Sequence, residues 1–125
     1  MTFNVSYSKY FLNKISTLTD DELMLIGIFI FQFSNNAFSA LPGRNKASTG
    51  VSKKHFNRIK LIQYAIKNNL WHYHVGHIKY NQAKSFGDWT SEYVVHYQKL
   101  NNNSIRLVSY SKHPPFIMPK PSTLI

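Results

Sequence analysis

The chain contains no cysteine among its 125 residues, which excludes disulfides, thiol catalysis and zinc sites built on cysteine. A long apolar run is also missing, because the longest one covers residues 23–33 and a helix needs about 20 apolar residues to cross a bilayer. The N-terminal residues lack a basic segment followed by an apolar one, so we expect no signal peptide. These absences predict a cytoplasmic protein without a membrane segment.

Acidic residues are scarce as well. The chain has 15 Lys and Arg against five Asp and Glu, and its formal net charge is +10. Three of the acids stand together at residues 20–22, whereas residues 23–87 hold nine basic residues and no acidic one. Because solvated surfaces usually mix both signs, this one-sided charge favours a polyanionic partner such as nucleic acid, a ribosome or an acidic protein.

Apolar residues are abundant enough for a folded core. They make up 43% of the chain, and aromatic residues make up 15%. We therefore expect a single domain over residues 1–125, with a proline-rich tail from about residue 114. The four prolines of that tail prevent it from continuing a central strand.

The first half of the chain shows one strand and two helices. Residues 2–7 alternate between apolar and polar side chains, as a short strand does. Thr19 and Glu22 form a capping box, which predicts an apolar helix over residues 20–35. After a loop, apolar residues at helical spacing predict a second helix over residues 52–68.

The second half shows strands. The apolar period falls to two over residues 71–75, 91–100 and 104–110, with a turn of three asparagines before the last segment. The expected fold is therefore α+β. Its elements follow the order β-α-α-β-β-β, and both helices pack on one face of a small antiparallel sheet.

Three histidines occur in the stretch LWHYHVGHIKY at residues 70–80. If Tyr73 faces the helices, then His72 and His74 face the other way. The same alternation predicts an open sheet face that carries His72, His74, His96, Arg106 and Tyr110. His113 follows just past the last strand.

Three interpretations of this face stay open. It can be an ordinary solvated face of an antiparallel sheet. It can also be a zinc or iron site of three histidines, namely His72, His74 and His96, although only Asp88 and Glu92 lie close enough in the sequence to orient such ligands.

The third interpretation is RNA cleavage without a metal. Attack by a 2′-hydroxyl needs a base, an acid for the leaving 5′-oxygen, and cations beside the phosphate oxygens. Histidine, tyrosine, lysine and arginine supply all of these groups. Nearby carboxylates would repel the phosphate, so this interpretation explains both the histidines and the charge.

The order of elements, the size and the basicity resemble the RelE/ParE superfamily of bacterial type II toxins. The segment LVSYSKHPPF at residues 107–116 is similar to the closing segment of the histidine-using RelE-like ribonucleases. The stretch WHYHVGHIKY at residues 71–80 occupies the position where relatives carry paired basic or histidine residues. The proline-rich tail after Phe116 has no counterpart in that family.

This resemblance implies a toxin that cuts mRNA on the ribosome without a cofactor, together with a cognate antitoxin that covers its basic groove. Other members poison DNA gyrase, but they generally lack a histidine-rich face. The resemblance implies that His113 is the general acid or base and that His72 and His74 assist it. Arg106 and Lys79 would stabilise the charge of the phosphorane.

The remaining site residues are expected in two groups. The catalytic set also contains His96 and Tyr110, and Tyr110 or Phe116 would stack on a base. The set that binds RNA contains Arg44, Lys46, Lys53, Lys54, Lys79 and Phe116. The alternatives are a basic RNA- or DNA-binding module without chemistry and a three-histidine metalloenzyme.

Overall fold

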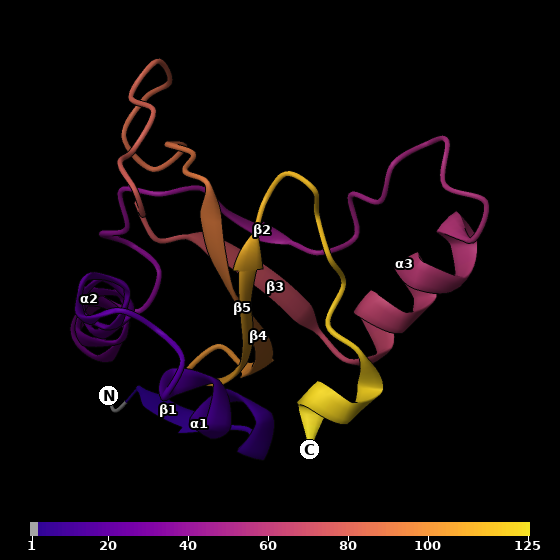
Figure 1. The fold of residues 1–125 in the computed structure, drawn as a ribbon, viewed down its shortest axis with the longest axis horizontal. Helices are drawn as coiled ribbons and strands as arrows, with labels where there is room; N and C mark the ends of the chain where they lie inside the picture. Colours follow the sequence, from indigo (N-terminus) through magenta and orange to yellow (C-terminus); the bar gives the residue numbers. More distant parts are fainter. Residues whose placement is uncertain (1–2) are drawn as a thin grey trace.

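A five-stranded sheet forms the centre of the computed structural model, which describes residues 3–125 (Figure 1). The strands are β1 (Asn4–Tyr7), β2 (Asn45–Ala47), β3 (Leu70–His74), β4 (Tyr93–Asn101) and β5 (Ser104–Lys112). Their order in the sheet is β1-β5-β4-β3-β2. β1 runs parallel to β5 and the other pairs are antiparallel. The α+β class is confirmed, but the sheet is mixed, and Thr2 of the expected first strand lies outside the described residues.

Three α-helices and one 3-10 helix accompany the sheet. They are α1 (Lys9–Ile15), α2 (Asp20–Asn36), α3 (Arg58–Lys67) and η1 (Pro121–Leu124). The predicted capping box begins α2, since the Glu22 amide donates to Thr19 Oγ1 and the Thr19 amide donates to Glu22 Oε1. Two elements were not expected from the sequence: α1, whose first turn is capped by the Ser8 hydroxyl, and the short edge strand β2.

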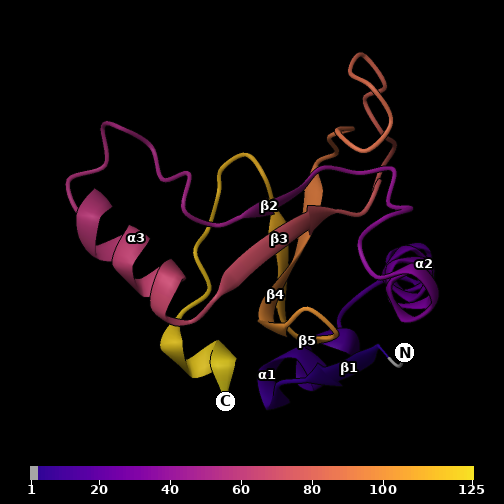
Figure 2. The ribbon, with the colours of Figure 1, turned by 180° about the vertical axis from the view of Figure 1, so that it is seen from behind.

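The hydrophobic core lies between α1, α2 and one face of the sheet. Phe29 of α2 stacks on Tyr73 of β3, with ring centroids 4.6 Å apart. Phe33, one turn further along α2, is fully buried and packs against Phe3 and Phe38. Figure 1 shows α2 end-on beside the sheet, and Figure 2 shows the same layer from behind.

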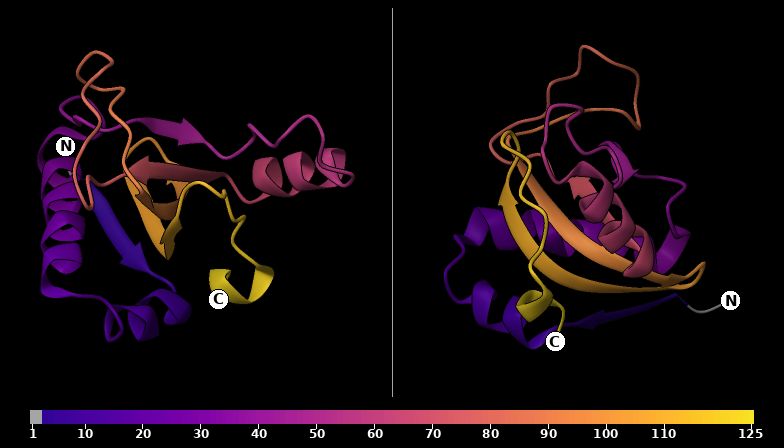
Figure 3. Two further views of the ribbon diagram at one scale, coloured as in Figure 1. Left: turned by 45° about the horizontal axis from the view of Figure 1, so that its top comes forward. Right: turned by 90° about the vertical axis from the view of Figure 1, so that its right-hand side faces the viewer.

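The second predicted helix does not pack on that face. It begins at Arg58 rather than near residue 52, and Figure 3 shows α3 extending away from the sheet. Phe56, just before this helix, is 95% exposed, and Ile59 and Ile66 are exposed as well. Two facts explain the difference. Residues of α2 already cover the core face of the sheet, and α3 comes directly after the edge strand β2 in the sequence.

The other face of the sheet is covered by the C-terminal tail, which here means residues 113–125. After β5 the tail turns back toward α3, as the yellow ribbon in Figures 1 and 2 shows. Tyr64 Oη of α3 donates to the Pro119 carbonyl at 2.8 Å, and Arg106 donates to the carbonyl of Leu124. The Lys9 amide donates to the Ile125 carbonyl at 2.7 Å. The prediction of an open sheet face is therefore wrong, because the tail covers that face.

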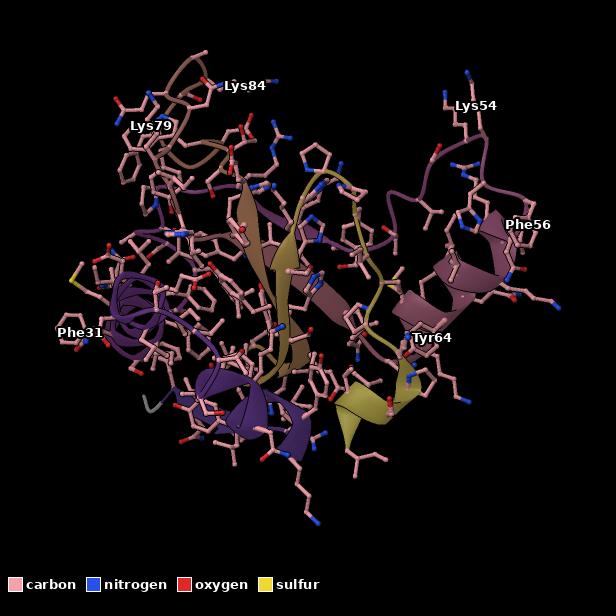
Figure 4. All side chains as sticks on the ribbon, viewed as in Figure 1. Phe31, Lys54, Phe56, Tyr64, Lys79 and Lys84 are labelled. Atoms are coloured by element: carbon pink, nitrogen blue, oxygen red, sulfur yellow. The ribbon has the colours of Figure 1, made fainter. Side chains whose placement is uncertain are left out.

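Replacing Phe33 with alanine should lower the free energy of unfolding by about 3–5 kcal/mol, because a buried ring leaves a cavity behind. Phe31→Ala is the matched control, since Phe31 belongs to the same helix and points away from the sheet (Figure 4). The control should change the free energy by at most about 0.5 kcal/mol. Urea denaturation followed by circular dichroism measures both, and equal losses would contradict this placement of α2.

Candidate active site

A β-bulge in β5 decides which side chains reach the covered face. His96 of β4 pairs with Ser109, and the next residue, Tyr97, pairs with Leu107, so Val108 has no partner. This extra residue shifts the alternation and places both Leu107 and Tyr110 on the core face. The predicted catalytic role of Tyr110 conflicts with this position, because its ring is buried in the core.

Four histidines and one phenylalanine meet on the covered face, and we call His72, His74, His96, His113 and Phe116 the histidine cluster. His72 and His96 are direct cross-strand partners, and His74 lies two residues further along β3. His113 follows β5, and its ring lies 5.4 Å from that of His74 and 5.5 Å from that of His72. Phe116 of the tail covers His72, His96 and His113 at 4.9, 5.6 and 5.3 Å between ring centroids.

Three of these histidines are almost fully buried. His72, His74 and His96 are 5%, 4% and 1% exposed. Burial lowers the pKa of His72 and His96 to about 3 and that of His74 to about 4. Burial also lowers the pKa of His113, and the charges of Arg44 and Lys46 lower it further. The imidazoles are therefore neutral at pH 7, and each keeps one nitrogen lone pair.

Serine residues hold most of the rings in place. His72 Nδ1 lies 2.9 Å from Ser48 Oγ, and His96 Nε2 lies 2.7 Å from Ser111 Oγ. His74 Nδ1 contacts both backbone groups of Ser91, the nitrogen at 3.0 Å and the oxygen at 2.9 Å. In contrast, Nδ1 of His96 and Nδ1 of His113 are buried without a hydrogen-bond partner among residues 3–125. These two nitrogens are the unsatisfied polar atoms of the cluster.

The edge strand β2 and the residue before it bring two cations to the cluster. Lys46 pairs with His72 across the ladder, and the His74 amide donates to the Arg44 carbonyl at 3.0 Å. Both residues therefore lie beside the two histidines of β3. Arg44 Nε also donates to Asp88 Oδ1 at 2.6 Å, and this bond lowers the pKa of Asp88. The Lys46 side chain is exposed.

Two cavities open beside these residues. The smaller one holds about 230 Å³ and is lined by Arg44, Lys46, Ser48, His72, His113 and Phe116, among others. The larger one holds about 800 Å³ and is lined by Lys79, Tyr80 and Glu92, among others. Arg44, His74 and His113 line both cavities, whereas His96 lines neither. A ligand therefore reaches His74 and His113 most directly.

The remaining predicted site residues lie elsewhere. Arg106 donates to Gln98 Oε1 and to the Leu124 carbonyl, so its guanidinium holds the tail rather than lining either cavity. Lys53 and Lys54 stand on the exposed segment before α3, and Lys79 belongs to a loop at the opposite end of the molecule from Lys54 (Figure 4). Of the predicted RNA-binding residues, Arg44, Lys46, Lys79 and Phe116 line a cavity.

Sequence reasoning missed the groups that fix the histidines. Ser48, Ser91 and Ser111 gave no signal, because their roles depend on how loops and strands meet in space. Gly43 belongs to the loop before β2. A Cβ atom there would come within 2.1 Å of the His74 carbonyl oxygen, so no other residue fits beside this end of β3.

The histidine group that could bind a metal differs from the expected one. Among residues 3–125, the ligand atoms of His72, His74 and His113 lie within 4.8 Å of one another. His113 is thus the third candidate ligand beside His72 and His74. His96, the third ligand expected from the sequence, instead has its Nε2 hydrogen-bonded to Ser111.

Comparisons with protein-family models, curated proteins and solved structures found no match for this chain. The resemblance to the RelE/ParE toxins therefore stays a prediction, and the function must be inferred from the geometry of the site. No helix within the described part of the chain is long and apolar enough to span a bilayer.

Acid should destabilise the protein, because the buried histidines have folded-state pKa values below the unfolded value of about 6.5. The free energy of unfolding keeps its full value above about pH 6.5, where these histidines are neutral in both states. It falls as the pH drops because only the unfolded state takes up the protons, until near pH 3 to 4 the folded state takes them up as well. At pH 5, each histidine that stays neutral costs about 2 kcal/mol relative to pH 7.

Thermal unfolding between pH 7.5 and 5 measures this loss. A His96→Gln variant should show a shallower fall in Tm than the wild type, and His55→Gln, on an exposed segment, should follow the wild type. A Tm that stays constant down to pH 5 would contradict the burial of the cluster.

Proposed function

We propose that this chain is an endoribonuclease that cleaves RNA without a metal, with His74 and His113 as its acid–base pair. The observation that carries the proposal is a small cavity in which the neutral imidazoles of His74 and His113 lie beside Arg44 and Lys46. No carboxylate of the described residues lines this smaller cavity. A phosphodiester anion fits such a lining, since cations face its oxygens and bases face its sugar.

In the proposed reaction, one imidazole of the pair accepts the proton of the 2′-hydroxyl while the 2′-oxygen attacks phosphorus. The bond from phosphorus to the 5′-oxygen breaks, and the other imidazole, in its protonated form, donates a proton to that oxygen. The products are a 2′,3′-cyclic phosphate and a 5′-hydroxyl. The phosphate anion favours a proton on the second imidazole, because its charge opposes that of Arg44 and Lys46.

Arg44 and Lys46 would stabilise the negative charge that develops on the phosphorane. Lys79, on the rim of the larger cavity, would guide the strand on either side of the cleaved bond. His72 and Phe116 are positioning residues here, because their rings pack against that of His113.

The biological setting proposed for this activity is that of a toxin that acts on mRNA in the ribosome and is held inactive by an antitoxin. The net charge of +10 supports an RNA target. The exposed apolar side chains of Phe56, Ile59 and Ile66 support a protein partner, and cations at Lys54 and Lys60 favour an acidic one.

His113→Gln should reduce cleavage by about 10²–10⁴-fold, because glutamine keeps a similar size but cannot exchange the proton. Primer extension on an mRNA in a reconstituted translation reaction, with and without ribosomes, measures the cuts. His77→Gln is the matched control, since His77 lines neither cavity, and it should cut like the wild type.

Filter binding of a short RNA separates catalysis from binding. The proposal expects His113→Gln to bind the RNA within about threefold of the wild type while losing cleavage. Full cleavage by His113→Gln would refute the proposal. If the wild type binds RNA in a salt-sensitive way but makes no cuts with or without ribosomes, the non-catalytic binding module is favoured instead.

A further inference from the structure

The three histidines that can reach one point also have the arrangement of a metal site. His72 and His74 lie two residues apart on β3 and face the same side, and His113 approaches them from the end of β5. One ligand atom of each lies within 4.8 Å of the others. Zinc binds imidazole nitrogen at about 2.0–2.1 Å, so tetrahedral ligands lie about 3.3 Å apart. Small ring movements therefore suffice to close the site.

His113 is the ligand that can make this movement. Its backbone amide is fixed by the Glu92 carbonyl at 2.7 Å, but its side chain stands on the first residue after β5. Its Nδ1 is buried without a partner among the described residues, which is an unfavourable state for a polar atom. A bound cation would satisfy this nitrogen or fix the ring so that the other nitrogen binds.

The two histidines of β3 have acceptors that could support metal ligands. A metal-bound histidine usually donates its second ring N–H to a carbonyl or a similar acceptor, which fixes the ring. In the tautomer with a proton on Nδ1, His74 donates to the Ser91 carbonyl at 2.9 Å and gives up its hydrogen bond from the Ser91 amide, and His72 donates to Ser48 Oγ at 2.9 Å. Both rings then present Nε2 as the ligand atom.

The ligand set selects the metal. Three neutral imidazoles without a carboxylate suit Zn²⁺ and disfavour Mg²⁺ or Ca²⁺, which prefer oxygen. The smaller cavity adjoins all three rings and leaves a fourth position for water. The charges of Lys46 and Arg44 both oppose a cation there, although Asp88 pairs with Arg44. We therefore expect a site that Zn²⁺ can both enter and leave, rather than a permanent structural centre.

We propose that His72, His74 and His113 bind one Zn²⁺ and that this ion switches off RNA cleavage. The inhibitory part rests on the proposed ribonuclease. Its reason is that a nitrogen bound to Zn²⁺ has no lone pair left for a proton. Because His74 and His113 belong to both sets, the metal-bound and the catalytic states exclude each other.

Isothermal titration calorimetry of the full chain with Zn²⁺, after treatment with a chelator and dialysis, tests the binding. The wild type should bind one equivalent, and His74→Gln and His113→Gln should each weaken binding by at least about tenfold. His77→Gln and His55→Gln, which lie outside the histidine cluster, should bind like the wild type, although each also removes one histidine. Mg²⁺ should give no heat of binding.

Thermal unfolding provides a second readout that needs no activity. Zn²⁺ should raise the Tm of the wild type and leave that of His113→Gln unchanged, because a ligand stabilises only the state that binds it. Circular dichroism confirms that each variant is folded. The site would be overturned if every ligand variant still bound Zn²⁺ like the wild type. It would also be overturned if the two control variants lost Zn²⁺ binding as much as the ligand variants did.

Primer extension with a chelator or with one equivalent of Zn²⁺ tests the inhibition. Cuts that appear with the chelator and disappear with Zn²⁺ support the full proposal. Zn²⁺ binding without cuts in either condition would keep the metal site and refute the ribonuclease. Cuts without Zn²⁺ binding would keep the ribonuclease and refute the metal site. Cuts that require Zn²⁺ would overturn the inhibitory role.

Discussion

The contact between Phe116 and the histidine rings is the interaction on which the site depends. Without the tail, the second face of the sheet would be an ordinary polar surface, and its histidines would be solvated. The tail removes this solvent and lowers the pKa values of His72 and His96. Burial thus turns a row of surface histidines into a set of neutral bases and ligands beside cations.

The covering of this face also explains how a small domain holds so many buried polar rings. Each of the three most buried histidines has a hydrogen bond to a serine, which offsets part of the cost of removing the ring from water. The tail is held by Tyr64 of α3 and by Arg106 of β5. Arg106, which was predicted to contact the substrate, therefore has a structural role, because it fixes the tail that covers the site.

Much of the framework was predictable because it depends on local pattern. The capping box of Thr19 and Glu22 gave the start of α2, and the period of two gave β3, β4 and β5. The placement of His72, His74 and His96 on one face is also confirmed, since their pairing follows the predicted alternation.

The failures have long-range causes. Alternation cannot reveal an additional residue, so the bulge at Val108 moved Tyr110 to the core. Apolar spacing indicated a packed face for the helix over residues 52–68, but it does not tell whether the sheet has room for it. The cover by the tail was not predictable either, because it depends on contacts such as that of Tyr64 with Pro119.

Nitrogen-15 NMR of the histidine side chains between pH 7.5 and 5.5 tests the central claim most directly. The account predicts that the imidazoles of His72, His74 and His96 keep the shifts of the neutral form throughout this range. Protonation of all three with midpoints near 6.5, the value of a solvated histidine, would contradict it and would show that the tail does not close over the cluster.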